Sequence, residues 1–318
     1  HSDETGFYVE NGKIELIAEN GRNWIEDIGN ESANGIFVGS GEVYIKGQEN
    51  FIKIKGEGIR TQEYITSASD KNKGKYSNTT KIIATDADNV LSSGETSLFI
   101  KENTAIEFEA ESGRNVITAY DSNYSNLDDS KNNRVIYSEG GRISLVAGKE
   151  NFIAPNNYIQ GENNLLNLAA LHATNNEQSS DEQIYLSAHT NTLLGSVIAE
   201  NSAKIRIVGT ENRINSGSWH DIDASSAKEA YSYAVTTRNN QNNSSAIVIN
   251  ALNNGFNEIK VSITPEDLKN EHQLASELVA ERTVYAADKG TITINGTSNI
   301  STASWVEENA EGYKYNST

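Results

Sequence analysis

A motif of three short segments recurs eight times along the chain. In the first copy, the apolar segment Phe7 to Val9 is followed by a polar turn and by the alternating segment Ile14-Glu15-Leu16. A second turn leads to an Asn-x-Ile segment, Asn23 to Ile25. Alternation with a period of two residues is typical of a β-strand with one buried face and one exposed face. Each copy is therefore expected to contribute three short strands.

A unit of this size cannot bury its apolar face alone, so the copies must stack on one another. Stacking at about 4.8 Å per copy gives continuous parallel sheets around one apolar interior. We therefore expect residues 1–318 to form a single all-β domain, a right-handed parallel β-helix of about eight or more coils, because parallel crossovers are almost always right-handed. The side chains expected to point into its interior include Ile14, Ile45, Phe108, Leu145 and Ile207.

The copies are unevenly spaced, and the extra residues fall mainly after the Asn-x-Ile segment. This spacing predicts insertions along one edge of the solenoid, at 53–97, 118–134, 154–170, 215–232 and 260–283. The longest insertion leaves room for a further, degenerate coil around Ile82-Ile83-Ala84. The segment that begins Thr264-Pro265 has the N-cap and N1 proline of a helix start, and its apolar residues fit one helix face. A short helix is therefore predicted over 264–279.

The asparagine of the third segment is present in every copy. Stacked coils would bring these amides into register, each bonded to the next, as in the Asn ladders of stacked β-structures. An amide column contains no nucleophile and no base, so we predict a structural ladder. Its members are Asn23, Asn50, Asn115, Asn151, Asn191, Asn212, Asn257 and Asn299.

The residue after each of these asparagines is expected to point outward, because the isoleucine that follows it points inward. This residue is Trp24 and Phe51 in the first two copies and Phe152 in the fourth. Exposed aromatic rings on the outside of a solenoid could bind a sugar ring or a protein partner. The alternative is that the rings stack on one another or are covered by a nearby loop.

Three further aromatic residues lie in the insertions, namely Tyr120, Tyr124 and Trp219. Loops at one edge tolerate changes of length, and large aromatic residues dominate interface hot spots. These residues are therefore candidate anchors for a binding partner. The alternative is that they fix their own loops to the solenoid.

Charge and composition exclude several classes of function. The net charge of −18 disfavours nucleic acid and anionic lipid as partners, because both require a positive surface. No apolar run is long enough for a transmembrane helix, so direct membrane insertion is not expected. The chain has no Cys, which excludes thiol catalysis and thiolate metal sites and suits export.

The polar clusters do not match known catalytic or metal sites. Ser218, His220 and Asp221 lie together in the sequence, but catalytic triads are assembled from distant segments. The five histidines lack metal-ligand spacing, and acidic pairs such as Asp86 and Asp88 do not match an EF-hand loop. We therefore predict no catalytic residue, no metal and no cofactor.

The sequence resembles the β-helical passenger regions of bacterial type V secretion adhesins. Two segments carry this resemblance: Gly140-Gly141-Arg142-Ile143-Ser144-Leu145-Val146-Ala147 and the segment from Gly35 to Ile45. These adhesins are the autotransporters and the filamentous-haemagglutinin-like adhesins, and the likeness extends from residue 6 to about 300. It implies a non-enzymatic fragment of a longer virulence-associated protein, exported across the outer membrane to the bacterial cell surface and thus extracellular. The partners it implies are a host receptor, a glycan or a neighbouring bacterial cell through self-association.

Two other functions fit a solenoid of this kind, since fold alone does not determine function. A polysaccharide-active β-helix, resembling lyases or phage tailspikes, would need acids or an arginine clustered on one sheet face. The outward positions, such as Lys13, Glu107 and Arg206, instead mix both signs of charge. The third possibility is a purely structural stalk.

Overall fold

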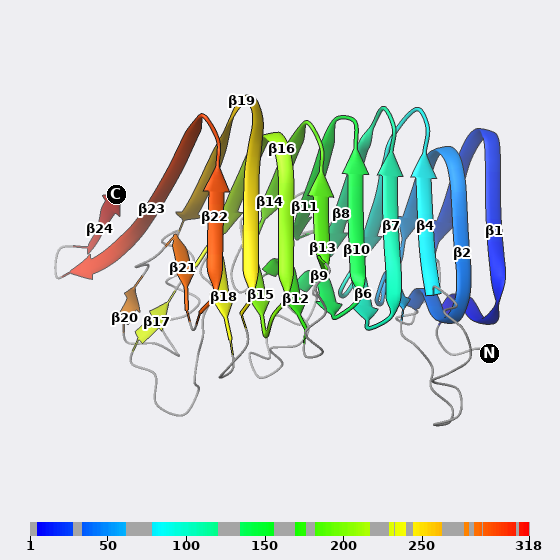
Figure 1. Ribbon diagram of the computed structural model, residues 1–318, viewed down its shortest axis with the longest axis horizontal. Helices are drawn as coiled ribbons and strands as arrows, with labels where there is room; N and C mark the ends of the chain where they lie inside the picture. Colours follow the sequence, from blue (N-terminus) through cyan, green and yellow to red (C-terminus); the bar gives the residue numbers. More distant parts are fainter. Residues whose placement is uncertain are drawn as a thin grey trace.

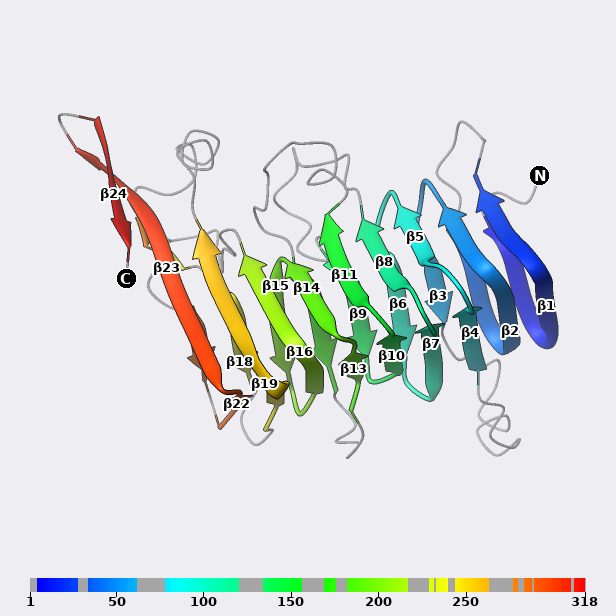
Figure 2. The same ribbon diagram turned by 90° about the horizontal axis from the view of Figure 1, so that it is seen from above.

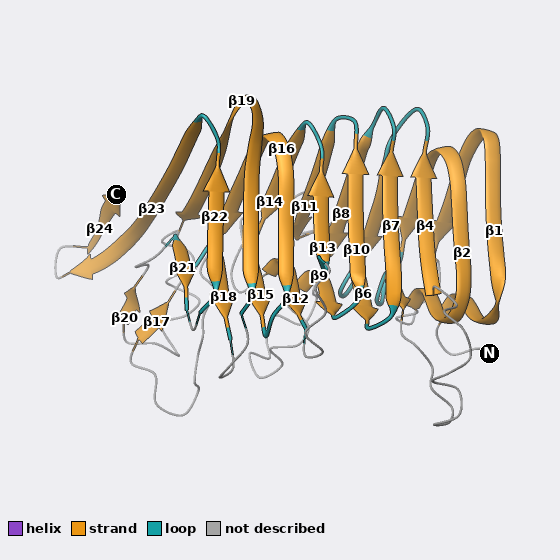
Figure 3. Cartoon of the chain, viewed as in Figure 1, coloured by secondary structure: helices purple, strands orange, loops and turns teal. Residues whose placement is uncertain are grey.

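The computed structural model describes residues 5–27, 34–61, 78–119, 134–155, 169–175, 182–216, 229–231, 233–239, 244–262, 277–279, 283–287, 289–309 and 312–317. The described part is all-β, and its strands pair in parallel except where β24 joins β23. No helix is present among these residues, and Figure 3 shows only strands and loops there. The prediction of an all-β fold built from parallel strands is therefore confirmed.

The strands form three parallel ladders. The first contains the opening parts of β1 (Thr5–Glu26) and β2 (Asn34–Lys53), then β3 (Ile59–Thr61), β6 (Leu98–Lys101), β9 (Arg134–Glu139), β12 (Ala169–Thr174), β15 (Ser196–Glu200), β18 (Val235–Arg238) and β21 (Val284–Ala286). The second contains the middle parts of β1 and β2, then β4 (Asn78–Ala84), β7 (Thr104–Ala110), β10 (Arg142–Ala147), β13 (Ile184–Ser187), the start of β16 (Lys204–Ser216), the start of β19 (Ala246–Ser262) and β22 (Thr291–Asn295).

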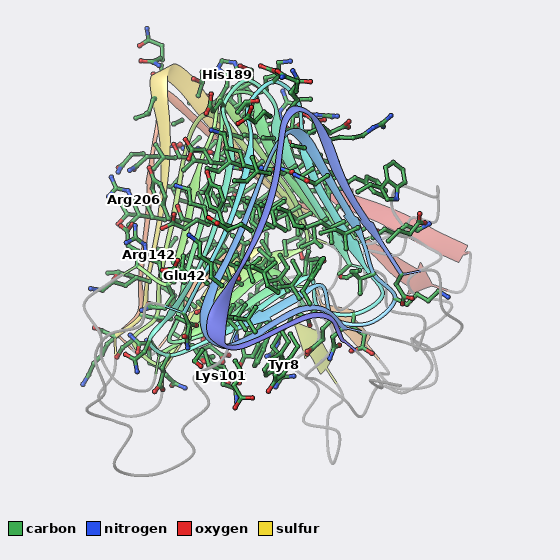
Figure 4. All side chains as sticks on the ribbon, turned by 90° about the vertical axis from the view of Figure 1, so that its right-hand side faces the viewer. Tyr8, Glu42, Lys101, Arg142, His189 and Arg206 are labelled. Atoms are coloured by element: carbon green, nitrogen blue, oxygen red, sulfur yellow. The ribbon has the colours of Figure 1, made fainter. Side chains whose placement is uncertain are left out.

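The third ladder contains the ends of β1 and β2, then β5 (Asn89–Ser93), β8 (Arg114–Ala119), β11 (Glu150–Pro155), β14 (Thr190–Leu194), the ends of β16 and β19, and β23 (Ser298–Asn309). The chain visits the three ladders in order and then repeats, so each visit adds one level to a stack. The levels follow one another along the long axis in sequence order (Figure 1), and Figure 2 shows the same order from above. Viewed along the stack, β1 bends into three sides of a triangle (Figure 4).

The interior of the stack is apolar because every second residue of each ladder points inward. Ile45, Phe108, Leu145 and Ile207 are fully buried, as predicted. Ile14 packs against the same core but is only partly buried, since it lies in the first described level. The alternation in the sequence therefore corresponds to burial, as in the pattern of β7, where buried and half-buried residues alternate.

The range 53–97 is not simply an insertion. It contains β3, β4 and β5, which continue all three ladders between β2 and the strands β6 to β8. The degenerate coil expected around Ile82 is therefore present. It escaped the main pattern because its first strand has only one apolar residue, Ile59, and its third segment has Leu91 in place of isoleucine.

The insertions do not all leave the stack at one edge. The ranges 118–134, 154–170, 215–232 and 260–283 follow the third-ladder strands β8, β11, β16 and β19, whose ends lie at one edge as predicted. The connection from Thr61 to Asn78 instead joins the first ladder to the second, as does that from β12 to β13. The prediction of a single edge is therefore wrong for the connection from Thr61 to Asn78, whereas the spacing between Ala173 and Ile184 in the sequence already indicates a second irregular site.

The predicted helix over 264–279 is wrong at its end. Residues 277–279 form the strand β20 (Glu277–Val279), which pairs in parallel with β17 (Glu229–Tyr231). A helix start is a local pattern, and here pairing with a distant strand decides the conformation of the last three residues. The remaining residues, 264–276, lie outside the described part of the chain. The final strand, β24 (Gly312–Ser317), pairs antiparallel with β23.

Candidate functional site

The asparagine column is a continuous ladder of buried amides. The Nδ2 atom of each residue donates to Oδ1 of the next, over 2.8 Å from Asn23 to Asn50 and 3.0 Å from Asn115 to Asn151. The ladder passes through Asn89, which the sequence analysis missed, and connects all eight predicted residues: Asn23, Asn50, Asn115, Asn151, Asn191, Asn212, Asn257 and Asn299. Each donor amide also bonds to a backbone carbonyl, for example Asn50 to Ile83 at 2.7 Å. These groups are fully engaged in holding the levels together.

The residue that follows each ladder asparagine points outward on the third ladder. In the first five levels these residues are apolar and in register, and we call them the apolar stripe: Trp24, Phe51, Val90, Val116 and Phe152. Trp24 is 55% exposed, and the other four are half-buried. The next residue in line, Thr192, is polar, so the stripe ends at Phe152. The three aromatic residues predicted to face outward thus belong to one surface.

The two aromatic rings at the start of the stripe stack on each other. The ring centroids of Trp24 and Phe51 are 4.2 Å apart, with 28° between the ring planes. Trp24 Nε1 donates to Glu26 Oε2 at 3.1 Å, and Lys53 Nζ lies 3.3 Å from Glu26 Oε1. The hydrogen bond from Trp24 has the largest effect on the Glu26 carboxyl and that from Lys53 the next largest. Together they hold its pKa below the usual value. Mutual stacking, the alternative given for these rings, is therefore what this pair shows.

A row of charges runs beside the stripe. It consists of the residue before each ladder asparagine in the same five levels, and we call it the charged row: Arg22, Glu49, Asp88, Arg114 and Glu150. Arg114 donates from Nε and Nη2 to Asp88 Oδ2, over 3.0 Å and 2.7 Å. This hydrogen bond is the main reason why the pKa of the Arg114 guanidinium is raised. Arg22 lies 3.9 Å from Glu49 and is only loosely held.

The first ladder has an outward row of its own, which the sequence analysis did not find. Its members are Tyr8, Phe37, Arg60, Phe99, Tyr137 and His172, in register across six levels. The rings of Tyr8 and Phe37 stack at 5.3 Å and 6°, and Arg60 Cζ lies 4.6 Å from the centroid of Phe99. Figure 4 shows Tyr8 and Lys101 projecting from this side of the triangle.

The register explains why this row was missed. In β9 the apolar run is Val135-Ile136-Tyr137, and β9 pairs Ile136 with Leu98 and Tyr137 with Phe99. Taking Val135 as the counterpart of Leu98 shifts the register by one residue, which places Tyr137 inward instead of outward. The middle residue of each correctly placed triplet is the signal that could have revealed the row.

Tyr137 lies in the middle of this row. Burial raises the pKa of its phenol above the ordinary value, and Oη donates to Glu139 Oε1 at 2.9 Å. Arg134 Cζ lies 3.9 Å from the ring centroid, and His172 packs against the ring at 5.1 Å. His172 is buried, and its Nε2 lies 3.1 Å from Glu200 Oε2. These contacts fill both sides of the ring, so the row is a packed structure in its middle levels.

The outer face of the second ladder is charged, with both signs mixed, as expected. Lys13 Nζ lies 2.8 Å from Glu15, and Lys81 Nζ lies 3.6 Å from Glu107. Arg142 and Arg206 project from this side in Figure 4. Acidic and basic side chains therefore neutralise one another along this face of the sheet.

Several predicted residues lie outside the described part of the chain. They are Tyr120, Tyr124, Ser218, Trp219, His220 and Asp221. Of the acidic pair Asp86 and Asp88, Asp88 is bonded to Arg114. Among the described residues no group of three or more His, Asp or Glu side chains could hold a metal ion.

The ring geometry limits the chemistry of these surfaces. A sugar ring binds against the face of an aromatic ring, but Phe51 covers one face of Trp24 and Phe37 covers one face of Tyr8. In each pair one ring face is therefore closed to a sugar ring. Partly exposed apolar side chains in a row are typical of a surface that contacts a partner.

No protein-family model, no curated protein and no solved structure matches the chain. In the part of the chain that the structure describes, no helix is long and apolar enough to span a membrane.

Proposed function

We propose that the chain is a right-handed parallel β-helix that acts as a non-enzymatic adhesin segment on a bacterial surface. The fold proposal is supported by the order in which the chain visits the three ladders and by the strong preference of parallel crossovers for the right hand. Each level makes hydrogen bonds to the next through both backbone and asparagine side chains, which suits a rigid stalk.

The observation on which the adhesin proposal depends is the apolar stripe. Five apolar side chains in register remain partly exposed on the outer face of the third ladder. Contiguous apolar surface of this kind is typical of an interaction site. The likeness of the sequence to type V secretion passengers suggests partners outside the cell: a host receptor, a glycan or another bacterium.

The test is adherence of cells that display the chain on an outer-membrane anchor. Displaying cells should bind host cells or a glycan array above the level of cells with the anchor alone. The double variant Trp24→Ser/Phe51→Ser should reduce binding about tenfold if hot-spot aromatics dominate the contact. Ile17→Ser is the matched control, because Ile17 is equally exposed but lies on the second ladder.

Tyr120→Ser and Trp219→Ser test the predicted loop anchors separately. Binding lost in these variants but kept in Trp24→Ser/Phe51→Ser would assign the contact to the insertions. Deletion of 53–97 is not a suitable test, because it removes a complete level of the stack. Equal adherence of displaying cells and anchor-only cells would contradict the adhesin proposal and leave the structural stalk.

A polysaccharide-active enzyme is the competing proposal from the sequence. The mixed charges of the second-ladder face offer it no support. Incubation of the chain with acidic polysaccharides, with and without calcium, should release no reducing ends and no unsaturated products. Release of either product would overturn the non-enzymatic proposal.

A further inference from the structure

The apolar stripe and the charged row together have the pattern of a self-complementary surface. We propose that this surface binds a second copy of the same chain, face to face, with the two stacks running in opposite directions. The inference does not rest on the adhesin proposal, because it concerns association of the isolated chain in solution.

The order of charges along the row is the first argument. From the first level to the fifth it is positive, negative, negative, positive, negative: Arg22, Glu49, Asp88, Arg114 and Glu150. A two-fold axis parallel to the strands, passing through the level of Val90, places level one opposite level five and level two opposite level four. Arg22 then faces Glu150 of the second copy, and Glu49 faces Arg114. Both contacts occur twice, so four pairs of opposite charge form.

The central level would be the weak point of this arrangement, because Asp88 then faces Asp88 of the second copy. However, Arg114 already holds each Asp88 through two hydrogen bonds to Oδ2 and one from its backbone nitrogen to Oδ1. Arg114 would then lie between Asp88 of its own chain and Glu49 of the second copy, so its single positive charge serves both carboxylates. Arg22, which is 63% exposed, lies 3.9 Å from Glu49 and has its Cζ atom 5.8 Å from the centroid of the Trp24 ring, and it is open to a carboxylate of the second copy.

The sizes of the apolar residues support the same orientation. The stripe is thick at its first two levels, with Trp24 and Phe51, thin at Val90 and Val116, and thicker again at Phe152. In the antiparallel arrangement Trp24 faces Phe152 of the second copy, Phe51 faces Val116 and Val90 faces Val90, so only the two end levels bring rings together. A parallel arrangement would place Trp24 against Trp24 and Phe51 against Phe51, which separates the other levels. It would also leave Glu150 facing Ala154 of the second copy rather than a cation.

The area of the surface predicts weak association. Five levels at about 4.8 Å, and a strand stretch of about 15 Å, give roughly 350 Å² per copy and roughly 700 Å² in total. This area is well below the roughly 1,200 Å² of stable complexes, so the contact must be weak and transient. We therefore expect dimers in solution only at high protein concentration, with stronger attachment where many copies are displayed side by side.

Sedimentation equilibrium of the full chain, from micromolar to near-millimolar concentration, measures this association directly. The wild-type chain should show a reversible monomer–dimer equilibrium. Val90→Lys places two ammonium groups against each other at the two-fold axis and should weaken the dimer about tenfold or more. Val146→Lys makes the same change on the second ladder, at a valine that is 40% exposed, and should have no effect.

A charge exchange tests the orientation. Arg22→Glu and Glu150→Arg should each abolish the homodimer, because each creates two like-charge pairs. An equimolar mixture of the two single variants should form a heterodimer in which both pairs are again opposite. The double variant Arg22→Glu/Glu150→Arg should form a homodimer, and its circular dichroism shows whether the substituted residues still allow the fold.

Four outcomes would overturn the proposal. The first is a wild-type chain that stays monomeric throughout the concentration range. The second is a dimer that Val90→Lys and Val146→Lys weaken equally. The third is a mixture of single variants that does not associate while the wild type does, and the fourth is a Glu150→Arg homodimer as stable as the wild type, as a parallel arrangement requires. A dimer that meets the expected pattern would still leave adherence to host cells to be decided by the display experiment.

Discussion

The side-chain amide of Asn89 donates to Oδ1 of Asn115 at 3.0 Å and to the backbone oxygen of Glu109 at 2.8 Å. One side chain thus joins two levels through both a side chain and a backbone carbonyl. Because the side-chain bond repeats from each asparagine to the next, from Asn23 to Asn299, the amides form an unbroken column inside the stack. Buried amides are costly when unpaired, so the column fixes which residue of one level lies above which residue of the next.

Asn115→Ala should therefore destabilise the protein markedly. The substitution removes the hydrogen bonds from Asn115 to Asn151 and to the backbone oxygen of Val146, and the acceptor for Asn89. With unsatisfied buried groups at about 1–3 kcal/mol each, we expect a loss of about 2–4 kcal/mol in the free energy of unfolding. Urea unfolding followed by circular dichroism measures it. Asn299→Ala, at the last and exposed position, should cost less than half as much, and equal losses would show that the column does not act as described.

Leu145→Ala tests the core. Leu145 is fully buried in the central cluster, so removal of its side-chain atoms leaves a cavity that the stacked levels cannot close. The expected loss is about 2–5 kcal/mol. Val146→Ala, the adjacent outward residue, should change the free energy of unfolding by less than about 1 kcal/mol. If Val146→Ala lowered the free energy of unfolding more than Leu145→Ala in urea unfolding, Val146 and not Leu145 would be the inward residue.

Gly94→Ala tests the spacing between levels. A Cβ atom at Gly94 would overlap the backbone carbonyl of Lys55 in the level before it, and backbone atoms cannot turn aside as a flexible side chain can. Overpacking of this kind should lower the free energy of unfolding by about 1–3 kcal/mol. At Gly12 a Cβ atom meets nothing within 4 Å, so Gly12→Ala is the control and should be neutral. Similar thermal midpoints for both variants would contradict the close approach.

Much of the fold could be predicted because the same pattern recurs in several copies. The ladder asparagines and the inward isoleucines recur at fixed offsets, and stacking requires each of them to lie above its counterpart in the preceding level. The level of β3, β4 and β5 was harder to recognise, since Arg60 and Thr61 replace apolar residues and Leu91 replaces isoleucine. Stacking accepts these exchanges because neighbouring levels supply the apolar surface and the backbone partners.

The surfaces could be predicted only in part, and the reason is register. Trp24, Phe51 and Phe152 follow an asparagine, so their outward direction was fixed by the ladder. The first ladder has no such marker, and Val135 and Ile136 are both buried, so alternation did not show which residue points outward. At the last level Asn299 is followed directly by Ile300, which pairs with outward Glu258 and is 45% exposed, so the spacing of the other copies does not hold there. Charges that meet only across a second copy leave no periodic signal in one chain.

The raised pKa of Tyr137 predicts a specific alkaline weakness. Burial favours the neutral phenol, so the folded chain keeps this proton to a higher pH than the unfolded chain, whose tyrosines titrate near pH 10. Between these two pKa values the folded state binds more protons, and stability must fall as pH rises. The contribution is fully present below about pH 10 and is lost as the pH rises through the folded pKa.

Tyr137→Phe removes this titration but keeps the ring that packs against Phe99 and His172. The difference in thermal midpoint between wild type and variant should be constant from about pH 7 to 9, where both forms are neutral at this position. Above about pH 10 the thermal midpoint of the wild type should fall more steeply than that of the variant. Only the wild type has a phenol at this position that ionises more easily in the unfolded chain than in the folded chain. Thermal unfolding by circular dichroism at a series of pH values measures both slopes. Parallel slopes up to the alkaline limit would show that the Tyr137 hydroxyl ionises equally easily in the folded and unfolded chains.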